Sequence, residues 1–125
     1  MLGIDIIKIS RMASLMERFG EKALQRFLCD EEIKNIKNAT SAAGYWAAKE
    51  ALSKALGTGI GKDCSFHDIK IYKTPKGAPK IALSSKLIQN FKIIDVALSI
   101  THDGQYAIAV VTIESSSPKE IIKQF

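Results

Sequence analysis

The first third of the chain has the pattern of one strand followed by short helices. Residues 2–9 form a short apolar run rich in β-branched side chains, which predicts a strand. Ser10 is a suitable N-cap for a helix that starts near Arg11, because apolar residues then recur at helical spacing. A second short helical piece is predicted at 23–28. A third begins at residues 30–32, whose acidic side chains suit the first turn of a helix.

The longest predicted helix covers residues 42–56. Thr40 or Ser41 serves as its N-cap, and Gly57 ends it because glycine adopts the left-handed C-cap conformation without strain. Apart from Lys49, Glu50, Ser53 and Lys54, nearly all of its residues are Ala, Leu, Tyr or Trp. We therefore expect this helix to be largely buried and to expose one narrow polar stripe.

The second half of the chain consists mostly of strand-like segments. Their alternating or β-rich patterns predict strands at 66–72, 80–83, 93–100 and 105–113, with one helix at 84–91. The pair Asp103-Gly104 lies between the last two strands and is a strong hairpin signal, which places His102 in the turn. The segment after Pro118 is expected to be loosely attached.

Length and composition describe an ordinary globular protein. At 125 residues, with 46% hydrophobic and 25% charged residues, we expect 1–125 to form a single domain with its own core. Cys29 and Cys64 lie far apart and lack metal-ligand spacing, so free thiols in a reducing cytoplasm are expected. The N-terminus lacks the features of a signal peptide, and no apolar run approaches the roughly 20 residues that span a bilayer.

The chain is basic, with a net charge of +5 and a pI of about 9.3. This balance indicates an anionic partner, which charge alone leaves open between nucleic acid, a phosphorylated cofactor and an acidic protein. A basic surface kept for solubility explains the same charge.

Two candidate acids stand out by their positions. Asp5 lies inside the apolar first strand, where a carboxylate must be hydrated, paired or bound to a metal. Glu50 lies on the long helix with Lys49, Ser53 and Lys54 along one arc, which is either a solvated stripe or the wall of a site. Two hard oxygen ligands, with other positions left to water and phosphate, suit Mg²⁺.

Two further segments have both a plain and a functional explanation. Residues 57–61 are glycine-rich and follow a helix, so they form either a C-cap with a turn or a backbone nest for phosphate. His102 is either an idle turn residue or part of a site, and no nucleophile elbow supports a pair between it and Ser99. Arg11, Arg18 and Lys22 fall near one helical face, which is either solvated or suited to an acidic helix.

Three segments together resemble the signatures of one family, the small phosphopantetheinyl transferases called holo-acyl-carrier-protein synthases. Residues 3–11 resemble its opening motif, a G-x-D with an arginine further on. Residues 46–59 are similar to its central W/F-x-x-K-E-A-x-x-K-A motif and glycine loop, and 99–107 to its closing S-[IV]-[ST]-H-D-x-x-Y-A motif. The turn at 77–79 fits its G-x-P segment, and the match runs over 2–113.

The resemblance implies an α+β fold, with a small antiparallel sheet packed on a long buried helix, that works as a homotrimer binding coenzyme A between subunits. Asp5 and Glu50 would bind Mg²⁺, and would act in catalysis with Lys54 and His102. The coenzyme A cleft would be lined by Lys49, Lys54, Gly57, Thr58, Gly59, Pro79, Ser99 and His102. An acidic apo-acyl carrier protein would dock on Arg11, Arg18, Lys22 and Arg26.

The implied reaction is attack by a carrier serine on the β-phosphorus of coenzyme A, with adenosine 3′,5′-bisphosphate leaving. A metal-bound water or a nearby carboxylate is the candidate base. One departure from the family pattern is Tyr45, which stands where the family often has an arginine. Two rivals are a metal-dependent phosphohydrolase and a basic nucleic-acid-binding module, although we expect neither nucleic acid nor membrane as a partner.

Overall fold

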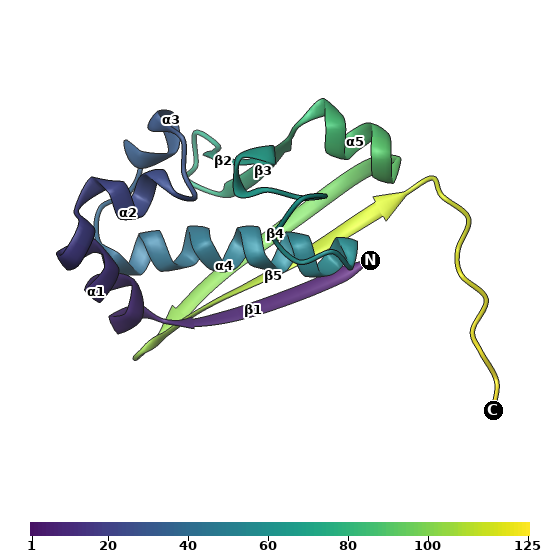
Figure 1. Cartoon of the computed structure of the whole chain (residues 1–125), viewed down its shortest axis with the longest axis horizontal. Coiled ribbons are helices and arrows are strands. Elements are labelled where there is room, and N and C mark those ends of the chain that lie inside the picture. The colour runs from purple at the N-terminus through teal and green to yellow at the C-terminus, as the bar shows by residue number, and fades with distance from the viewer.

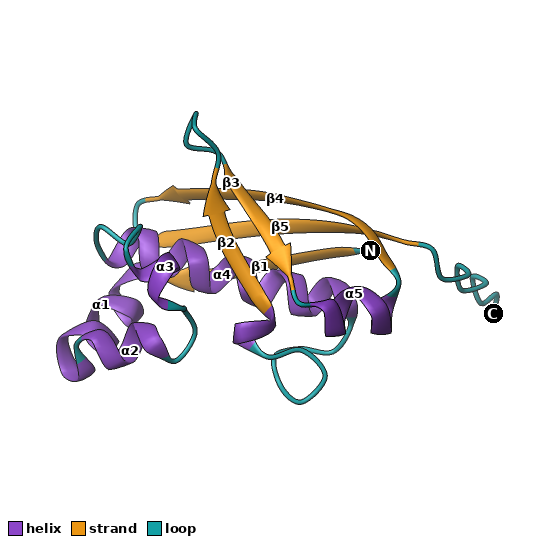
Figure 2. Ribbon diagram, turned by 90° about the horizontal axis from the view of Figure 1, so that it is seen from above, coloured by secondary structure: helices purple, strands orange, loops and turns teal.

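The computed structural model describes residues 1–125 and has one long helix enclosed by two small sheets and four short helices (Figures 1 and 2). In chain order the elements are β1 (Leu2–Lys8), α1 (Ile9–Phe19), α2 (Glu21–Gln25), α3 (Asp30–Ile33), α4 (Ala39–Leu56), the 3-10 turn η1 (Phe66–Asp68), β2 (Ile69–Lys73), β3 (Pro79–Leu83), α5 (Ser85–Phe91), β4 (Ile93–Asp103) and β5 (Tyr106–Ser115). The predicted α+β architecture is confirmed. None of the helices is long and apolar enough to cross a bilayer.

The main sheet is antiparallel, with the strand order β1-β5-β4, so β1 and β4 are its two edges. The second sheet is the ribbon of β2 and β3, which crosses the main sheet at a steep angle in Figure 2. α4 lies along the inner face of the main sheet and contacts all three of its strands. This arrangement leaves the outer face of the main sheet uncovered in the single chain.

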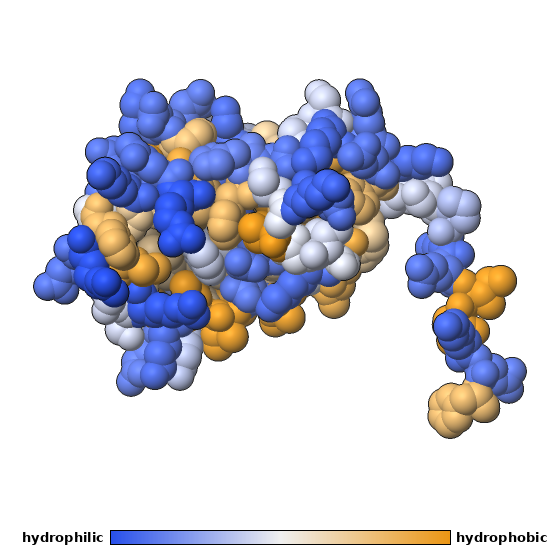
Figure 3. Space-filling view, in the orientation of Figure 1, coloured by the Kyte–Doolittle hydropathy of each residue, from blue (hydrophilic) through white to orange (hydrophobic).

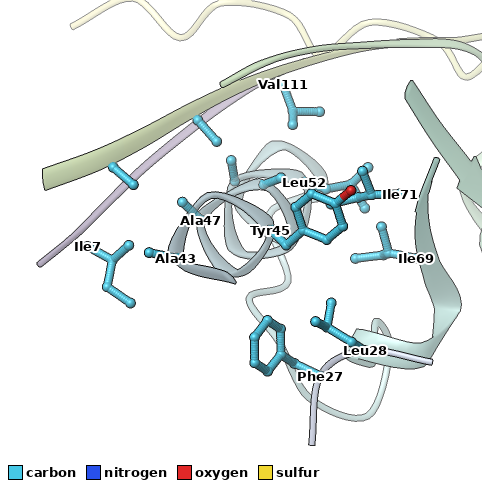
Figure 4. Packing of buried hydrophobic residues seen from close by; sticks show 14 of the residues in the cluster. Ile7, Phe27, Leu28, Ala43, Tyr45, Ala47, Leu52, Ile69, Ile71 and Val111 are labelled. Atoms are coloured by element: carbon cyan, nitrogen blue, oxygen red, sulfur yellow. The ribbon is translucent and has the colours of Figure 1, made fainter. Parts of the chain in front are cut away.

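The core is built around α4 because that helix carries small side chains on several sides. Five of its alanines are completely buried: Ala42, Ala43, Ala47, Ala48 and Ala51. Figure 4 shows the packing along the helix axis, with Val111 of β5 on one side, Ile69 and Ile71 of β2 on another, and Phe27 and Leu28 on a third. Small side chains allow backbones to approach closely, so the three strands of the main sheet and α1 pack directly on α4.

Several element boundaries differ from the sequence prediction. α4 begins at Ala39 because the Asn38 carboxamide accepts a hydrogen bond from the Ser41 N–H (3.0 Å), so Asn38 is the N-cap and the prediction of Thr40 or Ser41 is wrong. α1 is preceded by Lys8 rather than capped by Ser10. β2 starts only at Ile69, after η1, whose Asp68 carboxylate accepts a hydrogen bond from the Ser65 N–H (3.0 Å).

The closing hairpin also differs in a way that matters for the site. β4 continues to Asp103, and the turn consists of Gly104 and Gln105, with Gly104 in a left-handed conformation (φ 57°). His102 pairs with Ala107 across the ladder. The expectation that His102 lies in the turn is therefore wrong, because the ladder extends past the Thr101-His102 pair.

Candidate active site

A close contact between β1 and α4 brings the charged residues together. A Cβ atom placed on Gly3 would lie 1.9 Å from the Ala51 carbonyl oxygen and 2.6 Å from the Ala55 nitrogen, so only glycine fits there. Two residues further along β1, Asp5 lies on the same face as Gly3 and beside α4. The glycine of the opening motif thus sets the distance between Asp5 and the long helix.

Asp5, Glu50 and Lys54 form one charged group at the β1 edge of the sheet. The Lys54 ammonium donates to Asp5 Oδ1 at 2.8 Å and to the Ile4 carbonyl at 3.3 Å. The Lys54 side chain is 52% exposed while that of Asp5 is 13% exposed, so the group opens to solvent on the lysine side. The structure thus brings these three residues together, and their role as a site stays a prediction.

The electrostatics of this group suit a cation. Burial first, and then the neighbouring Asp5 carboxylate, raise the pKa of Glu50, while Lys54 opposes both effects. Two partly buried carboxylates that repel each other are stabilised by a hard cation, and carboxylate oxygens are ligands that Mg²⁺ accepts. The donor set of Asp5 and Glu50 therefore fits a divalent ion that completes its coordination with water or phosphate oxygens.

The remainder of the predicted polar stripe on α4 is not exposed. Lys49 and Ser53 are both completely buried, so only Glu50 and Lys54 of the four residues reach the surface. The Lys49 ammonium is bonded to Glu32 Oε1 (2.9 Å) and to the Phe27 carbonyl (2.6 Å). The expectation that Lys49 faces a cofactor is therefore wrong for this chain, because its charge is already paired inside the core.

The glycine loop after α4 is a helix cap rather than a preformed phosphate nest. The N–H groups of Thr58 and Gly59 both donate to the Ser53 carbonyl, at 3.1 and 3.2 Å. The N–H of Gly57 donates to the Lys54 carbonyl at 3.0 Å, with Gly57 in the left-handed conformation (φ 80°). Since these amides are used internally, the structure shows the first of the two alternatives, a C-cap with a turn, and what the loop offers is backbone without bulky side chains next to Lys54.

A separate cavity of about 550 Å³ lies at the other end of α4. His102 and Pro79, both predicted site residues, line it together with Lys37, Lys73 and Tyr45. The two lysines and the histidine make its walls suited to an anion. Sequence reasoning missed Lys37 and Lys73, which lie in or beside loops and carry no local signal of their own.

Tyr45 occupies a special place in this cavity wall. Its ring is 3% exposed, and its hydroxyl is buried without a hydrogen-bond partner within the chain. Burial, with the charge of Glu32 as a smaller cause, raises the pKa of Tyr45, so the hydroxyl stays protonated at neutral pH. Where the family pattern often has a charged arginine, this chain thus has a neutral group.

The charged group and the cavity lie at opposite edges of the main sheet. Asp5 is on edge strand β1, whereas His102 is on edge strand β4. Along α4, Lys54 and Thr40 are separated by about 21 Å at 1.5 Å per residue. Ser99 joins neither place, because it pairs with Val110 on the outer face of the sheet and is exposed.

The predicted docking residues all lie on the surface of α1, of α2 and of the segment just after α2. Arg11, Arg18, Lys22 and Arg26 are exposed. The Arg18 guanidinium lies 5.0 Å from the centre of the Phe19 ring. Phe19 is the last residue of α1, and Gly20 is the C-cap. Lys22 belongs to α2 rather than to a continuation of α1, so the single helical face predicted for Arg11, Arg18 and Lys22 is interrupted at Gly20.

Comparison with known proteins places the chain in a family. Residues 1–111 match the model of the 4′-phosphopantetheinyl transferase superfamily, and the chain belongs to this family. The holo-[acyl-carrier-protein] synthase of Sulfurimonas denitrificans is 61% identical over 121 residues, covering 97% of this chain and all of the relative. The synthase of Campylobacter fetus is 51% identical over 115 residues, covering 92% of this chain and all of the relative.

Solved structures show the same fold. The Helicobacter pylori holo-[acyl-carrier-protein] synthase in complex with coenzyme A is 49% identical and superimposes with a TM-score of 0.88, over 91% of this chain and all of that one. The Bacillus anthracis synthase, in complex with CoA (3′,5′-ADP), is 39% identical with a TM-score of 0.76, over 92% of this chain and 96% of that one. The resemblance inferred from the three motifs is confirmed.

Proposed function

We propose that this chain transfers 4′-phosphopantetheine from coenzyme A to a serine hydroxyl of apo-acyl carrier protein. The serine oxygen forms a bond to the β-phosphorus of coenzyme A, the bond from that phosphorus to the bridging oxygen breaks, and adenosine 3′,5′-bisphosphate leaves. Strong support comes from a single observation: the motif residues Asp5, Glu50 and Lys54 fold into one charged group within a chain of this family.

Asp5 and Glu50 would hold Mg²⁺ in this reaction. A bound Mg²⁺ would neutralise the charge that builds on the diphosphate, which is a main demand of phosphoryl-type transfer. The Lys54 ammonium, now shared between Asp5 and the Ile4 carbonyl, is placed to meet phosphate oxygens beside the same carboxylates. These three side chains orient the diphosphate, so much of the rate comes from holding the two substrates in place.

The cavity at the β4 edge would take the adenosine end of coenzyme A. Lys37, Lys73 and His102 supply positive or hydrogen-bonding groups there, and Pro79 and Tyr45 supply apolar surface. Since this cavity and the charged group lie at opposite edges of one sheet, a ligand that contacts both would lie between two chains. This separation supports an active site shared by neighbouring subunits.

The outer face of the main sheet supports a homotrimer. Leu2, Ile4 and Ile6 of β1 are 68%, 58% and 57% exposed, and Tyr106 of β5 is 41% exposed on the same face. Figure 3 shows apolar surface along the lower edge of the molecule, over β1. A sheet that is apolar on both faces needs cover on both, and we propose that two further copies of the chain provide it.

The carrier protein would dock on α1 and α2. Arg11 and Arg18 are exposed on the helix that follows β1 directly, and Arg11 is the closer of the two to Asp5 in sequence. Acidic partners are steered to such a surface by opposite charge, which also fixes their orientation. We place the reaction in the cytoplasm, where Cys29 and Cys64 remain free thiols as they are in this structure.

Intact-mass analysis of an apo carrier protein, incubated with this chain, coenzyme A and Mg²⁺, tests the function. The expected result is a carrier heavier by one phosphopantetheine, together with an equal amount of adenosine 3′,5′-bisphosphate. Release of that nucleotide without carrier protein would instead show a phosphohydrolase. An unmodified carrier, with salt-sensitive binding of DNA or RNA by this chain, would favour a nucleic-acid-binding module.

A further inference from the structure

Lys49 belongs to the central motif, yet the reaction described above gives it no task. It precedes Glu50 on α4, and its side chain is completely buried. Burial lowers the pKa of Lys49, with the Glu32 carboxylate as the main opposing influence. A buried ammonium in a helix whose other buried residues are mostly alanines calls for a reason beyond packing.

The Lys49 ammonium makes three hydrogen bonds, each to a different segment. It donates to the Phe27 carbonyl at 2.6 Å, just after α2, to Glu32 Oε1 at 2.9 Å in α3, and to the Phe66 carbonyl at 3.2 Å in η1. An ammonium has three donors, so all of them are used. The ammonium therefore connects α4 by hydrogen bonds to three segments that are remote in sequence: the segment just after α2, α3 and η1.

Glu32 extends these connections to two more backbone groups. Its Oε1 accepts a hydrogen bond from the Cys29 N–H at 3.0 Å, and its Oε2 accepts one from the Ile71 N–H of β2 at 2.9 Å. Glu32 is 1% exposed, so both ions of the pair are removed from water. We call Lys49, Glu32 and these bonded backbone groups the Lys49 clamp.

The clamp holds the segment that carries part of the proposed docking surface. Arg26 directly precedes Phe27, whose carbonyl accepts the shortest bond, and Lys22 lies on the helix that ends at Gln25. At its other end the clamp is anchored on α4 one residue before Glu50. Phe27 packs edge to face on Trp46 and Phe66, which are tilted relative to each other, and the ring centroids are 4.8 to 6.0 Å apart.

We propose that Lys49 is a positioning residue that fixes the α2–α3 segment, with Lys22 and Arg26, relative to Glu50. The clamp thereby sets where a docked carrier serine lies with respect to the diphosphate site. Buried ion pairs are often replaceable by apolar residues without loss of stability, so its value lies in the directed bonds rather than in stabilisation. The role of the clamp rests on the proposed docking of the carrier on α1 and α2.

The test is the double variant K49M/E32Q. Methionine keeps the length of the lysine stem, and glutamine keeps an acceptor oxygen while adding an amide donor, so no unpaired charge is left in the core. We expect the KM for carrier protein to rise about tenfold, because docking and orientation are disturbed together. The KM for coenzyme A should stay within about twofold, since its contacts lie elsewhere.

This pair of constants separates positioning from folding. Partial loss of folded enzyme lowers the apparent kcat but leaves both KM values unchanged, because KM does not depend on enzyme concentration. The matched control is K70M, which removes an exposed ion pair between the same two elements, Lys70 of β2 and Glu31 of α3 (3.7 Å). We expect K70M to match the wild type in both KM values.

The clamp proposal is overturned if folded K49M/E32Q keeps the wild-type KM for carrier while R11A/R18A raises it. If R11A/R18A also leaves that KM unchanged, docking on α1 has failed as well, and the clamp proposal falls with it. Should K49M/E32Q not fold, K49M/E32L takes its place, because it leaves neither a charge nor a side-chain amide in the core, although the Cys29 and Ile71 N–H groups lose their acceptor. The same KM comparison then decides.

Discussion

Single residues decide where the charges of the site can lie. Gly3 is needed because α4 backbone occupies the place of its side chain, and Asp5 reaches Lys54 only because β1 runs this close. Lys54 and Lys49 are five residues apart on the same helix and have opposite surroundings, one half exposed and one buried. Two lysines of the same motif therefore have different surroundings: Lys54 faces solvent beside Asp5, whereas Lys49 pairs with Glu32 inside the core.

The fit at Gly3 yields a prediction about stability. Gly3→Ala forces β1 away from α4, and overpacking of this kind costs about 1–3 kcal/mol of unfolding free energy. Chemical denaturation measures the loss, and transfer activity should fall with it because Asp5 moves. The control is Gly61→Ala, where an added Cβ meets nothing within 4 Å. A Gly3→Ala variant as stable as Gly61→Ala would contradict the close contact.

Removal of either carboxylate should affect catalysis far more than folding. Asp5→Ala or Glu50→Ala should lower the transfer rate at least about a hundredfold, the scale seen when one electrostatic group is removed from an active site. Circular dichroism should remain that of the wild type, since Lys54 is half exposed and tolerates the loss of its partner. Glu31→Ala, at a carboxylate 77% exposed on α3, is the control. Normal transfer by either variant, or by the wild type in excess chelator, would refute the metal assignment.

At the scale of elements, hydrogen bonds to one carboxylate connect η1, β2 and α5. Asp68 of η1 accepts hydrogen bonds from the Ser65 N–H (3.0 Å), Ser84 Oγ (2.9 Å) and the Lys86 ammonium (3.3 Å). Through these bonds the start of β2, the N-cap of α5 and α5 itself share one anchor. The ribbon that carries Pro79 and Lys73 to the cavity is therefore fixed at its base.

Asp68 should make the free energy of unfolding depend on pH in the acidic range. Partial burial raises the pKa of Asp68, but the hydrogen bonds from Ser65, Ser84 and Lys86 together outweigh it and lower the pKa to about 2. A depressed carboxyl pKa stabilises the fold above the unfolded value of about 3.9, and the effect is lost as pH falls through about 2.

We therefore expect Asp68→Asn to cost roughly 1–2 kcal/mol at pH 7 and progressively less between pH 4 and pH 2, at about the scale of a few hydrogen bonds to a charged group. Urea unfolding at a series of pH values measures the difference. Asp63→Asn, at an exposed acid in the preceding loop, is the matched control variant. A constant difference across this pH range would mean that the ionised form of Asp68 is not what stabilises the fold.

The first helix allows a prediction about the carrier. Arg11→Ala should raise the KM for carrier protein about threefold to tenfold at low salt and leave coenzyme A binding nearly unchanged, because opposite charges chiefly guide encounter and orientation. Charge reversal at Arg18 should act in the same direction but more weakly. Lys123→Ala, in the segment after β5, serves as the control. Unchanged carrier kinetics in R11A/R18A at low salt would show that these arginines are only solvated.

At the scale of the whole molecule, one sheet face and one terminal segment are left uncovered. The outer face of the main sheet carries Leu2, Ile4 and Ile6, while residues 116–125 extend away from the body beyond β5 (Figure 1). The inner face of the same sheet is covered by α4, so the chain has a closed hydrophobic core. Its outer sheet face, in contrast, keeps apolar side chains exposed to solvent. That residues 1–125 act as a single domain stays a prediction.

Assembly can be tested on the outer face. Ile4→Lys places a charge in the middle of the proposed contact, where desolvation is costly. Light scattering should then give a monomer, against a trimer for the wild type, and transfer should fall because the cavity and the charged group no longer meet across subunits. Ile88→Lys changes an apolar residue that is 43% exposed on α5 and should leave the trimer intact. A fully active wild-type monomer would rule the trimer out.

The sequence by itself determined the kinds of elements and the identity of the charged group. Periodicity located the long helix and the last two strands, since apolar spacing reflects which face is buried. Asp5 was recognisable as a carboxylate in an apolar strand, and Glu50 and Lys54 as polar residues one turn apart on an apolar helix. Spacing within one element is local information, so it can be obtained without the fold.

Only the tertiary structure decided which of the polar residues are free to meet a ligand. Lys49 is occupied because Phe27, Glu32 and Phe66, all at least 17 residues away in sequence, supply its acceptors. The amides after Gly57 are likewise used by the end of α4, and His102 lines one cavity with Lys37 and Lys73 only because the ribbon packs on the sheet. Hydrogen-bond partners that are distant along the chain leave no pattern in it, whereas burial of a whole face does.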